Sequence, residues 1–139
     1  MNRIVARLCL MPALVAGLAA CSSSGSKQAE ENPNLPPVDY KQEILLTLTR
    51  TLDDPTNLRD AFISDPALTP VGKDERYTAC VRFNMRDARH SYTGAKDHVA
   101  YFYGGHLNQL VDATPEQCSK AAYKPFPELE KLCLANKCG

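Results

Sequence analysis

The sequence predicts a small α+β domain: an antiparallel β-sheet packed on an N-terminal helix, with a short C-terminal helix and disulfide bonds across the fold. Three observations lead to this class. Apolar residues recur with helical spacing over residues 40–52, apolar and polar residues alternate over residues 75–85, and two β-rich runs flank Gly104-Gly105. The predicted order is therefore helix, strand, strand, a hairpin of two strands, and helix.

The first predicted element is a helix over residues 40–52. Its apolar positions share one helical face: Tyr40, Ile44, Leu45, Leu48 and Leu52. Asp39 is the predicted N-cap, and Gln42 occupies the capping-box position. Pro55 disfavours helical geometry in the residue before it, so we expect the helix to end at Asp53-Asp54-Pro55.

The next segments contain one ambiguous strand and one clear strand. Residues 58–63 have no clean period and are interpreted as a strand, and Pro66 and Pro70 bracket a predicted irregular turn. Over residues 75–85 the predicted core face holds Tyr77, Ala79, Val81, Phe83 and Met85. Cys80 and Arg82 belong to the opposite face. Residues 86–97 are polar, carry Gly94 and predict an exposed loop.

Residues 98–112 predict a β-hairpin with Gly104-Gly105 as its two-residue turn, because such turns need positive φ. This turn pairs Tyr103 with His106, and the pairing continues residue by residue to Val99 with Leu110. We expect the helix over 40–52 to cover a face that holds Phe83, Ala100, Phe102, Leu107 and Val111. The other face of the hairpin holds Val99, Tyr101, Tyr103, His106, Asn108 and Leu110.

The C-terminal part predicts short helical segments. Thr114-Pro115-Glu116-Gln117 has the N-cap, first-turn proline and capping-box residue of a helix start. Pro125 and Pro127 keep this helix short. Residues 127–132 predict one further helical turn before the C-terminal cysteines.

The N-terminus has the pattern of a secretory signal peptide. Arg3 and Arg7 precede an apolar stretch over residues 8–20. This stretch is shorter than the roughly 20 residues of a membrane-spanning helix. The stretch ends in Leu18-Ala19-Ala20-Cys21, which resembles the lipobox of bacterial lipoproteins. The resemblance implies a signal peptide over 1–20, cleavage before Cys21, and lipidation of Cys21 with diacylglycerol and a further acyl chain such as palmitate.

The same resemblance implies a location. Ser22 stands where the family's inner-membrane proteins carry aspartate, which implies a lipid-anchored protein of the outer membrane facing the periplasm. Residues 21–38 are rich in Ser, Glu, Asn and Pro and predict a lipidated flexible tether, with the folded domain over 39–139. Loss of residues 1–20 leaves a formal charge of −2, which gives no overall attraction to nucleic acid.

Four cysteines remain for the folded domain: Cys80, Cys118, Cys133 and Cys138. An even number in an oxidising compartment predicts disulfides. Three connectivities are possible, and we favour Cys80–Cys118 with Cys133–Cys138. The first bond would draw the C-terminal segment across the second face of the sheet and partly cover it.

The candidate catalytic and metal-binding patterns are weak. In the predicted hairpin, His98 and His106 lie roughly 17 Å apart on opposite faces, and His90 lies in the loop, so we interpret the histidines as solvated or edge residues. No Gly-x-Ser-x-Gly motif occurs, and Gly104-Gly105 has no phosphate-binding fingerprint. The sequence predicts no catalytic residue, no metal and no cofactor.

Candidate partner-binding residues fall into two groups. Arg82, Arg86 and Arg89 lie in or beside the basic loop over 82–96, and guanidinium groups suit carboxylate or phosphate. Tyr101, Tyr103 and His106 form an amphipathic row. These residues favour a non-enzymatic envelope lipoprotein that binds a protein or cell-wall partner. The alternatives are a module that binds an anionic envelope ligand through the basic loop, and an envelope hydrolase or hydrolase inhibitor.

Overall fold

A computed structural model describes residues 32–133 of the chain. Along the chain its elements are α1 (Tyr40–Thr51), β1 (Arg59–Ile63), β2 (Ala67–Val71), β3 (Asp74–Arg86), β4 (Tyr92–Tyr103), β5 (His106–Asp112), β6 (Lys124–Pro125) and α2 (Pro127–Glu130). None of the helices within this part of the chain is long and apolar enough to cross a bilayer.

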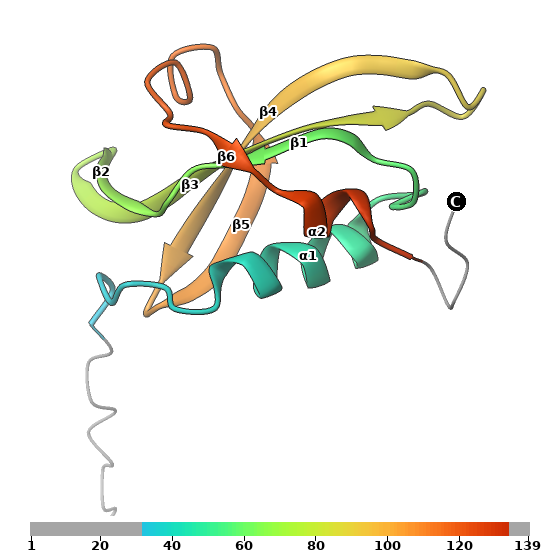
Figure 1. Cartoon of the computed structure of the whole chain (residues 1–139). Coiled ribbons are helices and arrows are strands. Elements are labelled where there is room, and N and C mark those ends of the chain that lie inside the picture. The colour runs from blue at the N-terminus through green and yellow to red at the C-terminus, as the bar shows by residue number, and fades with distance from the viewer. Residues whose placement is uncertain (1–31, 134–139) are drawn as a thin grey trace, which may run out of the picture.

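The six strands form one antiparallel sheet in the order β5-β4-β3-β1-β6, and β2 pairs with the first half of β3. Figure 1 shows α1 and α2 on the same side of this sheet. The predicted combination of an antiparallel sheet, a covering helix and a short C-terminal helix is therefore confirmed. The helix that we described as N-terminal precedes the sheet but begins only at Tyr40, well inside the chain.

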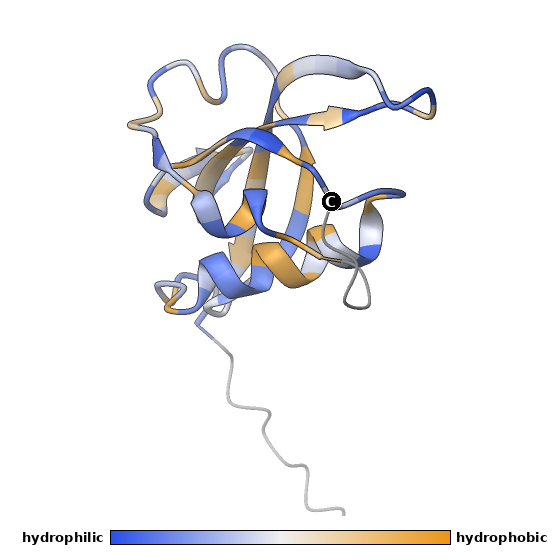
Figure 2. Ribbon diagram, turned by 45° about the vertical axis from the view of Figure 1, so that its right-hand side comes forward, coloured by the Kyte–Doolittle hydropathy of each residue, from blue (hydrophilic) through white to orange (hydrophobic). Residues whose placement is uncertain are grey.

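The hydrophobic core lies between the two helices and the covered face of the sheet. Ile44 and Leu48 of α1 pack with Phe83 of β3 and Phe102 of β4, as the sequence predicted. Phe126 and Leu129 add the C-terminal contribution and are fully buried. Figure 2 shows orange hydrophobic segments of the strands and of α1 meeting between helix and sheet, whereas the turn between β3 and β4 is largely hydrophilic.

Helix α1 ends close to its predicted boundary, but it begins differently. Asp39 makes no side-chain cap, and only its backbone carbonyl accepts a bond from the Glu43 amide at 3.1 Å. The Glu43 carboxylate reaches across to β5 instead, where it accepts hydrogen bonds from the Leu107 amide and from Nδ1 of His106. This side chain fastens α1 to the edge strand.

Two segments that we predicted as irregular are strands. The turn predicted between Pro66 and Pro70 is strand β2, in which Pro70 pairs with Glu75. Proline is tolerated here because β2 pairs with β3 on one side only and needs no donor on the other. The second half of the loop predicted over residues 86–97 is strand β4, which begins at Tyr92. Its polar character reflects a ribbon that projects beyond the core (Figure 1).

The β4–β5 hairpin has the predicted two-residue turn, with Gly104 at φ 58° and Gly105 at φ 84°. Tyr103 pairs with His106 and Phe102 with Leu107, but a register shift follows, so Tyr101 pairs with Gln109 and Ala100 with Leu110. The predicted pairs beyond Phe102 are therefore wrong by one residue. As a result Leu110 packs toward the core and Val111 is 44% exposed, the reverse of the prediction.

The C-terminal segment also differs in part. The helix predicted to start at Thr114 is a series of turns, although the Gln117 side chain does accept a bond from the Thr114 amide at 2.7 Å. The predicted helical turn over 127–132 is present as α2. The tether predicted to reach residue 38 is in contact with the domain from Pro33 onward, whose carbonyl accepts a bond from the Gly104 amide at 3.2 Å.

Candidate functional site

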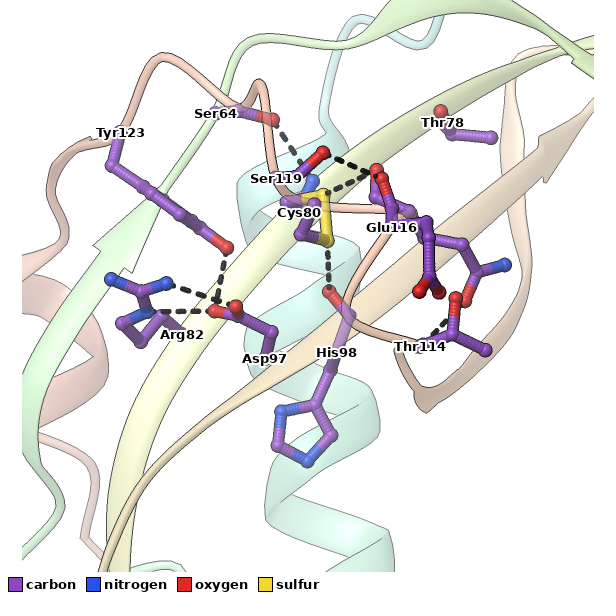
Figure 3. Close-up of a disulfide and its surroundings, with 12 residues drawn as sticks. Ser64, Thr78, Cys80, Arg82, Asp97, His98, Thr114, Glu116, Ser119 and Tyr123 are labelled. Carbon is purple, nitrogen blue, oxygen red and sulfur yellow. Dashed lines mark hydrogen bonds and ion pairs between the residues drawn. A yellow bond between two sulfur atoms is a disulfide. The ribbon is translucent and has the colours of Figure 1, made fainter.

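The face of the sheet opposite α1 is half covered by the segment over residues 113–123. Cys80 of β3 and Cys118 of this segment form a disulfide, as predicted, and both residues are buried. The amide of Cys80 donates to the Ser64 hydroxyl at 2.9 Å, which ties the bond to the end of β1. Figure 3 shows the disulfide lying between β3 and the overlying segment.

A second fastening lies beside the disulfide (Figure 3). Arg82 of β3 donates two hydrogen bonds to the Asp97 carboxylate of β4, at 2.7 and 2.9 Å. The Tyr123 hydroxyl donates to the same carboxylate at 2.7 Å, and the Arg82 guanidinium lies 4.5 Å from the Tyr123 ring centre. Arg82 and Asp97 therefore hold Tyr123 against the sheet.

Electrostatics fixes the protonation states of this group. The hydrogen bonds from Arg82 lower the pKa of Asp97, so the carboxylate is charged at neutral pH. Burial, followed by the hydrogen bond to Asp97, raises the pKa of Tyr123, so its phenol stays protonated. A phenol that keeps its proton and donates it to a carboxylate is a positioning group and a poor nucleophile.

The uncovered half of this face contains a groove of about 420 Å³, formed by β2, β3, β4 and β5. We define the groove by the side chains that line it: Val71, Arg76, Tyr101, Tyr103, Gln109 and Val111. The Arg76 guanidinium lies 5.5 Å from the Tyr103 ring centre. Tyr103 and Val111 are 46% and 44% exposed, which leaves a large apolar surface open to a ligand.

The covered and open halves of the face meet at Tyr101. The Gln117 amide nitrogen, on the overlying segment, donates to the Tyr101 hydroxyl at 2.7 Å. The predicted coverage of this face by the C-terminal segment is therefore real but partial. It ends at Tyr101, and the groove begins there.

The sequence predicted two of the groove residues and missed others. Tyr101 and Tyr103 lie in the groove, whereas His106 bonds Glu43 of α1 at 2.8 Å and does not line it. Arg76 and Val71 were missed because the β2–β3 hairpin was not recognised. The signal was the pair Gly72-Lys73 between two extended runs, with Gly72 at φ 66°.

The basic residues of the predicted loop do not gather at one place. Arg82 is bound to Asp97 on the sheet face opposite α1. Arg86 pairs with Asp54 at 2.8 Å, beside a pocket that also contains Leu52 at the end of α1. Arg89 is exposed in the turn between β3 and β4. An anion could therefore not contact the three guanidinium groups together in this arrangement.

The histidines also require a correction. We predicted solvated or edge residues, but His98 is buried and stacks on Phe83 with ring centres 4.3 Å apart. Burial lowers its pKa, against the opposing effect of Asp112, whose carboxylate lies 3.3 Å from Nε2. His90 is exposed in the β3–β4 turn, as expected. Within residues 32–133 there is no group of three or more His, Cys, Asp or Glu side chains that could hold a metal ion.

Several predictions fall outside the described residues. The signal peptide over 1–20 and Cys21 precede them, and Cys138 follows them, so the signal peptide, lipidation of Cys21 and the Cys133–Cys138 bond stay predictions. In comparisons with known proteins, no family model matches the chain, and neither a curated protein nor a solved structure matches it. The function is therefore inferred from the residues themselves.

Proposed function

We propose that this chain is a lipid-anchored accessory protein of the outer membrane, with its domain in the periplasm, that binds an envelope partner through the groove and catalyses no reaction. The observation that carries the proposal is the groove itself, where Tyr101 and Tyr103 of β4 lie with Arg76 of β3 on an open sheet face. Tyr and Arg are enriched in protein recognition surfaces because both combine apolar area with hydrogen-bonding capacity.

Two features support the location. The lipobox-like Leu18-Ala19-Ala20-Cys21 follows a signal-like leader. The Cys80–Cys118 disulfide joins two buried residues, and such bonds persist in oxidising compartments such as the periplasm. The leader and the disulfide are independent observations, because one concerns export and the other concerns the folded domain.

The lining of the groove suits an extended peptide that carries a carboxylate. Tyr101, Tyr103 and Val111 offer apolar surface, Gln109 offers an amide for backbone groups, and Arg76 offers a guanidinium. Arg76 already lies 3.5 Å from the Asp74 carboxylate, but Asp74 is 69% exposed, so a ligand carboxylate can compete for the guanidinium. Such a peptide is either a segment of an envelope protein or the stem peptide of the cell wall.

The state of the polar groups on this face favours binding over catalysis. Asp97 is occupied by Arg82 and Tyr123, and Tyr123 keeps its proton. Cys80 and Cys118 are joined to each other and present no thiolate. The reactive groups beside the groove are therefore used to hold the covering segment in place.

A photo-crosslinking experiment in intact cells tests the proposal. Benzoylphenylalanine replaces Val111, which lines the groove and is 44% exposed, or Leu68 of β2, which is 43% exposed and lies outside the groove lining. We expect a discrete adduct from the Val111 position and none from Leu68, with the adduct reduced by Arg76→Glu. Release of the adduct by muramidase identifies the cell wall, and a defined protein mass identifies a protein partner. Equal labelling from both positions would contradict a binding groove.

A further inference from the structure

The residues that lead into α1 form one end of the molecule together with the β4–β5 turn. The Gly104 amide donates to the Pro33 carbonyl at 3.2 Å, and a side-chain carbon built at Gly105 would lie 3.5 Å from Cβ of Leu35. Pro37 is buried, which anchors this segment to the domain. Figure 1 shows residues 32–39 running beside the β4–β5 turn, at the end opposite the β3–β4 turn.

This end carries two exposed apolar side chains, Leu35 and Val38, which we call the N-terminal tip. Their exposed fractions are 43% and 86%. Val38 is the more exposed of the two, and covering it would remove its apolar surface from water.

The position of the predicted anchor limits what can cover the N-terminal tip. Cys21 precedes Asn32 by eleven residues, so the chain between them spans at most about 40 Å, whatever its conformation. Pro33 is attached to the tip itself through Gly104. A lipid attached at Cys21 therefore keeps the tip within about 40 Å of the bilayer, whereas the β3–β4 turn lies at the far end of the twelve residues of β4, roughly 40 Å farther along the domain.

We infer that the N-terminal tip contacts the lipid surface, with Leu35 and Val38 at the level of the headgroups. The inference rests on the proposed lipidation of Cys21. A contact of this size is too weak to hold a free domain on a bilayer, but a short covalent tether raises its effective concentration and makes the contact persistent.

The charges around the N-terminal tip indicate an apolar contact. Val38 lines a pocket with Asp39, Lys41 and Glu128, so side chains of both charge signs lie beside it. Glu43 is bonded to His106 and to the Leu107 amide. These residues do not form a basic patch for anionic headgroups. The contact is therefore expected to respond little to salt.

Tryptophan reporters test the inference, since the chain contains no Trp of its own. The lipidated protein is purified from membranes and reconstituted into phosphatidylethanolamine–phosphatidylglycerol vesicles that contain a lipid with a shallow spin label. Val38→Trp places the reporter on the tip, and Ala88→Trp places it in the exposed β3–β4 turn. We expect a blue shift and several-fold stronger quenching for Val38→Trp than for Ala88→Trp, with the same result at high salt.

The possible outcomes distinguish a tip that does not contact lipid from a protein that is not lipidated. If the protein floats with the vesicles but both reporters stay unquenched and unshifted, the tip does not contact lipid and the inference is wrong, while the anchor stands. If the purified protein does not float with vesicles, the proposed lipidation fails and the inference fails with it. Leu35→Ser in the Val38→Trp background should reduce the quenching and leave flotation unchanged.

Discussion

At the scale of single residues, the Cys80–Cys118 bond explains why a polar segment stays on a sheet face. Residues 113–123 contain turns and no helix or strand, so their backbone supplies little cooperative structure. The disulfide fixes the segment at Cys118 instead, and the contacts of Tyr123 with Asp97 and Arg82 fix it at its end. Because these contacts hold the segment over residues 113–123 in place, we expect the open half of the face to stay uncovered.

Loss of the disulfide should therefore destabilise the whole domain. The bond joins residues 38 positions apart, and the chain-entropy model assigns a loop of this length about 4 kcal/mol. We expect Cys80→Ala/Cys118→Ala to lower the free energy of unfolding by about this amount, measured by guanidinium denaturation. Reduction of the wild-type protein should give a similar loss. An unchanged denaturation midpoint would show that the bond does not constrain the chain.

His98 makes stability depend on pH. Burial holds its pKa below the ordinary 6.5, so between these two values the unfolded chain binds more protons than the folded domain. The free energy of unfolding should therefore decrease as the pH falls through about 6.5 toward the lower folded pKa. His98→Phe keeps the stacking on Phe83 but cannot be protonated, so the decrease should become smaller.

Denaturation curves at pH values from about 7.5 to about 5 test this effect. His90→Phe serves as the control because His90 is exposed in a turn. Identical pH profiles for the wild type and His98→Phe would show that His98 contributes no proton linkage.

At the scale of elements, the strongest test concerns the two faces of α1. Leu48 is 2% exposed and packs in the core, whereas Leu46 on the same helix is 45% exposed. Leu48→Ala should lower the free energy of unfolding by about 2–5 kcal/mol, and Leu46→Ala by no more than about 0.5 kcal/mol. Equal effects in thermal or chemical denaturation would mean that α1 does not pack as described.

The β4–β5 turn gives a second test at this scale. Gly105 has a φ of 84°, and an added Cβ would have ordinary contacts with Leu35, so backbone conformation is the limiting factor. We expect Gly105→Ala to cost about 1–2 kcal/mol. Gly105→Asn should cost less, because asparagine adopts positive φ more readily. The reverse order of the two variants would contradict the turn geometry.

Helix α1, strand β3 and the β4–β5 turn could be predicted from the sequence because each has a strong local signal. The register shift could not be predicted from turn geometry alone. Leu107 and Leu110 are three residues apart, so a regular strand would place them on opposite faces, and the shift lets both pack toward the core. Their spacing was the available clue.

Other elements were missed because alternation fails where a strand has no buried face. Residues 92–97 extend a two-stranded ribbon, and β2 is an edge strand, so neither needs a repeating apolar pattern. The capping signal at Thr114 is real, since the Gln117 side chain accepts a hydrogen bond from the Thr114 amide. The disulfide at Cys118 nevertheless holds the segment in turns. Tertiary constraints decide the structure at these positions.

At the scale of the whole molecule, the two faces of the sheet differ in what they carry. The face toward α1 holds the core, and the opposite face holds the covered disulfide region and the groove. Tyr101 and Tyr103 of the groove were predicted from the alternation in β4, whereas Arg76 required the β2–β3 hairpin. The described chain begins at the end of the domain that carries the β4–β5 turn, where the Gly104 amide bonds the Pro33 carbonyl.

The groove, the disulfide and the N-terminal tip would share one cellular setting through the proposed lipidation of Cys21. The most direct test is the intact mass and N-terminal peptide of the protein extracted from membranes. We predict a mature chain that starts at Cys21 and carries thioether-linked diacylglycerol with an acylated amino terminus. A chain that retains residues 1–20, or an unmodified Cys21 sulfur, would contradict the account.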